Sequence, residues 1–114
     1  MKLIRTLSLG AVGLTVLFGA GASMAQAGNA DASRALHVRQ LAANCAACHG
    51  TDGKAVSGSA LAVLAGMPAD RMIAALTEAK AGKRPDSTVM HQLAKGLSDE
   101  QIKTLADYFA AQKP

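Results

Sequence analysis

The chain holds only two cysteines, and they lie three residues apart in the stretch AANCAACHG. Cys45 and Cys48 are followed at once by His49. A disulfide between the two thiols would close a very small loop and would therefore add little stability. A thioredoxin-like redox pair accompanies alternating strands and helices, and this sequence shows no such alternation. A structural zinc site needs four ligands, usually from a second paired motif, whereas the remaining histidines, His37 and His91, are not paired.

The first 27 residues have the layout of a secretory signal peptide. Two basic residues come first, an uncharged and mostly apolar run follows over residues 7–22, and small residues then fit cleavage after Ala25 or Ala27. A retained membrane anchor is the alternative, but the run is shorter than the ~20 apolar residues of a membrane span. We therefore expect export to the periplasm, removal of residues 1–27 and one domain over residues 28–114.

That domain has few large apolar side chains. Its aromatic residues are Tyr108 and Phe109, it has no tryptophan, and much of its apolar content is alanine, which buries little area. Domains this small often need a disulfide, a metal or another aid to stay folded. The net charge of +4 includes the two basic residues of the expected signal, and no block of lysine and arginine occurs. Nucleic-acid binding is therefore a poor interpretation, and we expect a bound group to fill the centre.

Hydrophobic periodicity predicts an all-α domain with three main helices, over residues 32–44, 69–81 and 99–112. Asp31 or Ser33 can cap the first helix. Ser98 and Gln101 form a capping box for the third, and Pro68 and Gly82 suit the two ends of the second. Glycine-rich residues 50–66 and residues 83–88 are expected to be loops, and residues 89–96 can add a short helical turn. No strand, repeat or low-complexity linker is evident.

The sequence Cys-x-x-Cys-His is the attachment signature of a c-type haem. The spacing lets two thioethers hold neighbouring vinyl groups on one edge of the porphyrin, while the adjacent histidine reaches the iron from one face. An export signal, a thin core and two long loops all agree with a haem at the centre of the domain. We therefore expect one covalent haem c, attached at Cys45 and Cys48 and ligated by His49.

With this motif the chain resembles the small monohaem class I cytochromes c of bacteria. The matching elements are CAACHG and MHQLAKGLSDEQIKTLADYFAAQK, and the resemblance covers residues 31–113. The second element is most similar to the cytochrome subunit of flavocytochrome c sulfide dehydrogenases. The resemblance implies a small class I cytochrome c fold. In that family a proline carbonyl usually accepts the hydrogen bond of the ligand histidine, and here Ala62 lies near that place.

The second axial ligand of the iron is expected to be Met90, which follows the second loop and matches the family's ligand position. Met72 lies on the apolar face of the second helix, where core packing is the better interpretation. Met67 precedes that helix and is expected to fill a gap. His91 is the rival ligand, and His37 is expected at the surface.

Two strong protein ligands leave no open site on the iron, and a thioether ligand favours the ferrous state. The sequence therefore predicts a one-electron carrier, not an enzyme by itself. The alternatives are the haem subunit of a flavocytochrome c sulfide dehydrogenase and a haem sensor or peroxidase-type protein with a labile sixth site. Expected partners are redox proteins, a flavoprotein sulfide dehydrogenase among them, with no nucleic acid and no stable membrane insertion. Basic residues that could ring the haem edge are Lys54, Lys80, Lys83, Arg84 and Lys95. Candidates for core or haem contacts are Leu61, Leu64, Ile73, Leu76, Val89, Leu93 and Leu97.

Overall fold

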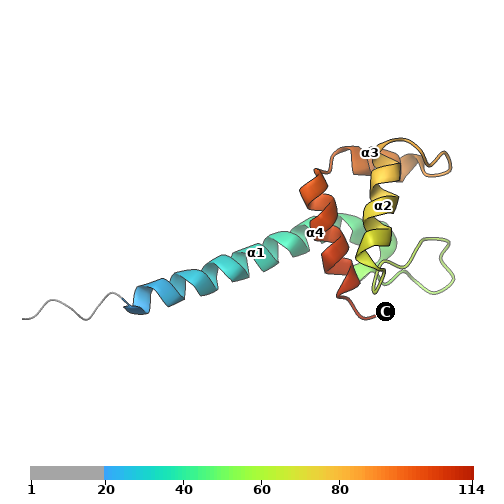
Figure 1. Ribbon diagram of the computed structural model, residues 1–114. Helices are drawn as coiled ribbons and strands as arrows, with labels where there is room; N and C mark the ends of the chain where they lie inside the picture. Colours follow the sequence, from blue (N-terminus) through green and yellow to red (C-terminus); the bar gives the residue numbers. More distant parts are fainter. Residues whose placement is uncertain (1–19) are drawn as a thin grey trace, which may run out of the picture.

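The computed structural model describes the backbone of residues 20–114 and the side chains of residues 28–114. Within that range the elements are four α-helices, one short 3-10 helix and no strand, which confirms the all-α prediction. In chain order they are α1 (Ala20–His49), η1 (Thr51–Gly53), α2 (Ala69–Lys80), α3 (Thr88–Lys95) and α4 (Asp99–Ala110). Figure 1 shows α1 as a long helix that projects away from the body, while α2, α3 and α4 gather near its C-terminal end.

Helix α1 is longer at both ends than the predicted 32–44, so those bounds are wrong. Asp31 and Ser33, expected as caps, lie inside the helix. The physical reason is that the stretch is rich in alanine, the strongest helix former, and contains no proline to stop it. Residues 1–19 of the expected signal peptide lie outside the described residues, and signal removal stays a prediction. Within the described part of the chain, no helix is long and apolar enough to cross a membrane.

The other helices follow the predicted pattern closely. Helix α2 ends one residue before the expected bound, and Gly82 beyond it has a φ of +71°, the left-handed conformation that glycine adopts at helix ends. Helix α3 is a regular helix of eight residues where only a short turn was expected. Helix α4 begins with the predicted capping box: the Ser98 hydroxyl accepts from the Gln101 N–H at 3.1 Å, and the Gln101 side chain accepts from the Ser98 N–H at 2.8 Å.

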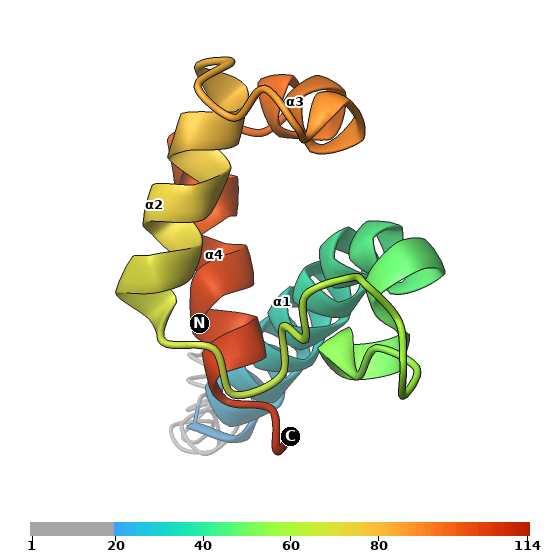
Figure 2. The same ribbon diagram turned by 90° about the vertical axis from the view of Figure 1, so that its right-hand side faces the viewer.

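The core lies where α4 packs on α1 and α2. Phe109 and Leu105 of α4 are each 2 % exposed, and Met72 of α2 reaches the same cluster, which confirms its core role. The small side chains of Ala42 on α1 and Ala106 on α4 are also buried there. Figure 2 shows α2 and α4 side by side, with α3 across their upper end and the C-terminal part of α1 running beside α4. The core is therefore formed by three helices, and α3 packs chiefly against α2.

Candidate functional site

Cys45, Cys48 and His49 lie on one face of the last turn of α1, because residues at positions i, i+3 and i+4 of a helix share a face. Cys45 is half-buried, Cys48 is exposed, and the two form no disulfide. Burial raises the pKa of the Cys45 thiol, so this group stays protonated at neutral pH. No group of three or more His, Cys, Asp or Glu side chains gathers as a metal site in the part of the chain that the structure describes.

The imidazole of His49 is held by the loop that follows η1. Its Nδ1 lies 2.8 Å from the carbonyl oxygen of Ala62, and the residue is only 9 % exposed. A carbonyl only accepts hydrogen bonds, so Nδ1 is the donor and Nε2 is the ring nitrogen that this bond leaves unused. The backbone carbonyl of Ala62 therefore serves as the acceptor. In the family that this chain resembles, a proline usually supplies that carbonyl. The bond fixes the orientation of the ring and leaves Nε2 as the nitrogen that could ligate a metal.

Two glycines let the loop return to His49. Gly50 leaves α1 with a φ of +80°, and a Cβ there would lie 2.0 Å from the Lys54 carbonyl oxygen. The carbonyl of Gly53 accepts from the N–H groups of Leu64 and Ala65 at 2.9 and 3.2 Å. A Cβ on Gly53 would lie 2.7 Å from the Leu64 Cβ and 2.9 Å from the Phe109 ring. The close approach at Gly53 therefore joins the loop to the core and brings Ala62 to the histidine.

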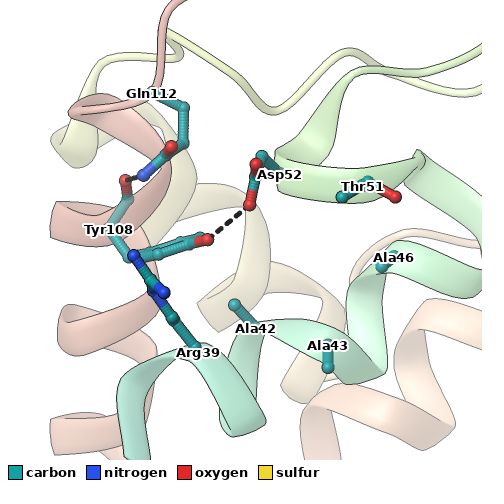
Figure 3. A pocket seen from close by; sticks show the side chains of 8 residues that line it. All are labelled: Arg39, Ala42, Ala43, Ala46, Thr51, Asp52, Tyr108 and Gln112. Atoms are coloured by element: carbon teal, nitrogen blue, oxygen red, sulfur yellow. Dashed lines mark hydrogen bonds between the residues drawn. The ribbon is translucent and has the colours of Figure 1, made fainter. Parts of the chain in front are cut away.

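A polar contact that sequence reasoning missed joins α4 to η1. The Tyr108 hydroxyl donates to the Asp52 carboxylate at 2.6 Å (Figure 3). The hydrogen bond to Asp52 raises the pKa of Tyr108, with smaller contributions from burial and from the Asp52 charge, while Arg39 opposes them. These side chains line a hollow of about 410 Å³ between α1, η1 and α4. The two residues are 56 positions apart in the sequence, so no local pattern predicts their contact. The one available signal is that the chain has a single tyrosine, whose hydroxyl needs a partner.

Met90 lies on α3 and is half-buried. Helix α3 packs on α2, whereas α1 packs on α4 and η1, so Met90 and His49 lie on helices with different packing partners. Figure 2 shows α3 above the C-terminal end of α1. Met67 packs against the core cluster, in line with its expected gap-filling role, and His37 is exposed as expected.

Large aliphatic side chains on the loop after η1 and on α3 face solvent in the protein alone. Exposed large aliphatic side chains on two segments that also carry candidate ligand contacts are typical of a surface that something else covers. The same loop holds His49 through Ala62, and the same helix carries Met90, so these residues fit a flat apolar group such as a haem. The exposed members are Val56 at 79 %, Leu61 at 45 %, Val63 at 49 %, Val89 at 66 % and Leu93 at 52 %. The other sequence candidates pack against the core instead: Leu64, Ile73, Leu76 and Leu97.

One of the five basic residues expected at the haem edge is engaged within the fold. The Lys80 ammonium donates to the Leu97 carbonyl at 2.8 Å and to the Asp99 carboxylate at 2.9 Å. This lysine therefore ties α2 to the start of α4 and is not available as a docking charge. The remaining four are exposed: Lys54, Lys83, Arg84 and Lys95.

Comparison with known proteins identifies the family. The sequence profile of the family described as cytochrome c matches residues 36–113. The chain belongs to the cytochrome c family. Membership confirms the predicted cytochrome c fold and the covalent haem c.

Three curated relatives show which kinds of cytochrome this chain is similar to. The chain is 42 % identical over 69 residues to the cytochrome subunit of sulfide dehydrogenase from Chlorobaculum tepidum, covering 60 % of each chain. It is 35 % identical over 102 residues to cytochrome c-552 of Acidithiobacillus ferridurans, covering 87 % of this chain and 43 % of that one. It is 37 % identical over 73 residues to the thiosulfate dehydrogenase electron acceptor of Thiomonas intermedia, covering 64 % and 33 %. The chain thus spans between a third and three fifths of these relatives.

Proposed function

We propose that the chain is a periplasmic one-electron carrier whose haem is attached at Cys45 and Cys48 and ligated by His49 and Met90. The observation that carries the proposal is the 2.8 Å bond from His49 Nδ1 to Ala62, on the same helix face as both thiols. This bond leaves Nε2 as the free imidazole nitrogen. Attachment and one axial ligand can therefore come from a single turn of helix.

The bound haem supplies an iron that gains and loses one electron, and the chain's residues set how easily it does so. His49 is held at fixed orientation by Ala62, so its ring needs no rearrangement between the two oxidation states. A thioether ligand supplied by Met90 would favour the ferrous state. The aliphatic side chains of the loop after η1 and of α3 would exclude water from the apolar surface of the haem. Together these residues favour rapid electron transfer over binding of an external substrate.

The attachment and the export step are tested by intact-mass analysis of protein from the native cell. We expect residues 28–114 or 26–114 plus one haem that survives acidic acetone. The variants Cys45→Ala and Cys48→Ala should each lose one thioether and most of the holoprotein. A mature chain without haem would refute the attachment, and a retained N-terminal segment would refute the signal peptide.

The axial ligands are tested by the weak near-infrared charge-transfer band that a methionine sulfur gives on ferric haem iron. Met90→Ala should abolish this band, whereas Met67→Leu and Met72→Leu should keep it, because those two side chains pack against or within the core. Loss of the band in Met67→Leu alone would show that the ligand is misassigned. Ready binding of carbon monoxide by the wild-type ferrous protein would favour a labile sixth site.

A second candidate is the haem subunit of a sulfur-oxidising dehydrogenase, with a flavoprotein as its partner. It is favoured by relatives named as the cytochrome subunit of sulfide dehydrogenase and as electron acceptors of thiosulfate dehydrogenase. Gel filtration of native extract at low and high salt, followed by haem absorbance, separates the two. A free carrier should elute alone at both salt concentrations. Co-elution with flavin that persists at high salt would instead establish the complex.

A further inference from the structure

Helix α3 carries the proposed ligand Met90 and has little packing of its own. It is eight residues long, and helices this short do not hold together in water without tertiary contacts. Its one buried residue is Ala94, while Val89 and Leu93 are 66 % and 52 % exposed. The position of α3, and of Met90 with it, therefore depends on how α3 packs against α2.

One such contact is a hydrogen bond from His91 to the end of α2. His91 Nδ1 lies 2.6 Å from the carbonyl oxygen of Ala79. That carbonyl belongs to the last turn of α2, where main-chain acceptors have no partner further along the helix, and it also accepts from the Gly82 N–H at 3.0 Å. Because a carbonyl can only accept, Nδ1 must carry the proton and donate it.

The turn after α2 is shaped to receive this imidazole. Gly82 has a φ of +71°, and a Cβ built on it would lie 3.2 Å from the His91 Cε1. The His91 ring thus lies directly against Gly82. A side chain at position 82 would crowd the ring. A second tie holds the far end of α3, because Lys80 donates to the Leu97 carbonyl just beyond that helix. Neighbouring residues of α2, Ala79 and Lys80, therefore hold both ends of the segment that carries Met90.

We propose that His91 is a positioning residue for the axial methionine: its Nδ1–H bond to Ala79 fixes α3 on α2 and keeps Met90 within reach of the iron. The inference rests on the proposed ligation by His49 and Met90. Because His91 directly follows Met90 in α3, loss of the bond releases the backbone that carries the thioether. The bond lies between two half-buried or buried residues, and a hydrogen bond of this kind contributes enough to shift a local opening equilibrium about fivefold to tenfold.

The experiment measures how readily added imidazole displaces the methionine from the ferric holoprotein, followed by loss of the near-infrared band. Three variants of His91 distinguish the effect of losing the hydrogen bond from the effect of losing the imidazole ring. In His91→Asn the amide nitrogen lies near the place of Nδ1, in His91→Gln the amide lies further out, and in His91→Ala no donor remains. We expect the apparent affinity for imidazole to rise about fivefold to tenfold in the Ala and Gln variants and to stay at the wild-type value in the Asn variant.

Tyr108→Phe is the matched control, since it removes a hydrogen bond between elements at the α4–η1 contact instead of at α3. It should lower resistance to denaturant, measured by far-UV circular dichroism, without changing the affinity for imidazole. Unchanged imidazole affinity in His91→Ala, or an equal rise in all three His91 variants, would overturn the inference while leaving Met90 as ligand. A wild-type protein without the near-infrared band would refute the Met90 ligation and the inference with it. Loss of the low-spin spectrum in His91→Asn would show that His91 is itself a ligand.

Discussion

Two apolar regions of this cytochrome are made of similar residues and are buried to opposite degrees. Leu105 and Ala106 of α4 are 2 % and 0 % exposed, whereas Val89 and Leu93 of α3 are 66 % and 52 % exposed. The first region is closed by α1, α2 and α4 without any other group. The described residues leave most of the surface of Val89 and about half of that of Leu93 uncovered, and we infer that the haem covers this second region. The comparison teaches that the chain builds a complete helical scaffold and an incomplete cofactor face.

The largest expected effect lies in the scaffold. Leu105→Ala removes a fully buried side chain and should lower the free energy of unfolding by about 2–5 kcal/mol, through lost burial and the cavity left behind. Guanidinium titration of the haem-loaded protein, followed by far-UV circular dichroism, measures it. A decrease in the free energy of unfolding that is as large for Leu93→Ala as for Leu105→Ala would contradict the difference between the two regions.

The next effect concerns the point where the loop meets the scaffold. Gly53→Ala places a Cβ 2.7 Å from Leu64 and 2.9 Å from the Phe109 ring at a φ of +78°, and should cost about 1–3 kcal/mol for overpacking in addition to the backbone strain. Gly58→Ala is the control, because it has a φ of +82° and open space around it, so only the left-handed strain of about 1–2 kcal/mol applies. Equal losses in the same titration would show that packing at Gly53 is unimportant.

A smaller effect tests the cofactor face directly. Leu93 and Leu36 are 52 % and 58 % exposed in the protein alone, so exposure predicts similar and small losses for both alanine variants. If haem covers Leu93, its remaining surface is also buried in the holoprotein, and Leu93→Ala should cost about 1 kcal/mol. Leu36→Ala on α1 should stay within about 0.5 kcal/mol of wild type. Indistinguishable losses in the holoprotein would contradict the assignment of α3 to the cofactor face.

The smallest effect is a dependence on pH at the Tyr108–Asp52 contact of the scaffold. The raised pKa of Tyr108 in the folded protein means that the unfolded chain loses this proton first as the pH rises. The contact therefore contributes fully below the ordinary tyrosine value of about 10, and its contribution is lost as the pH rises through the higher folded pKa. Because the chain has one tyrosine, a single ¹³Cζ resonance in the nuclear magnetic resonance spectrum reports the titration.

Asp52→Asn should lower the midpoint of that titration toward about 10, since it removes the charge and weakens the acceptor. Asparagine suits the left-handed φ of +55° at this position, so the backbone should be kept. Asp107→Asn is the control, because Asp107 pairs with Lys103 at 2.6 Å and does not contact the tyrosine hydroxyl. A midpoint that is the same in wild type and Asp52→Asn would contradict the bond.

Features of this protein that depend on neighbouring residues could be predicted from the sequence. Cysteine spacing and the adjacent histidine are sufficient to predict a covalent haem, because the attachment chemistry needs those groups within one helical turn. The capping box at Ser98 and Gln101 predicted where α4 begins, since both partners lie three residues apart. The core role of Met72 followed in the same way from helical periodicity. The wrong start predicted for α1 also has a local cause. Asp31 and Ser33 are typical cap residues, but they do not interrupt a helix when the residues around them are rich in alanine.

Contacts between groups far apart in the sequence became visible only in the folded chain. The acceptor for His49 is 13 residues away at Ala62, and the acceptor for His91 is 12 residues back at Ala79. Lys80 was expected as a surface charge, but it reaches Asp99, 19 residues further on. These contacts depend on how the loops return and on backbone carbonyls, whose positions no side-chain pattern records. The residue types therefore predict the haem, while the path of the loops determines which groups hold its ligands.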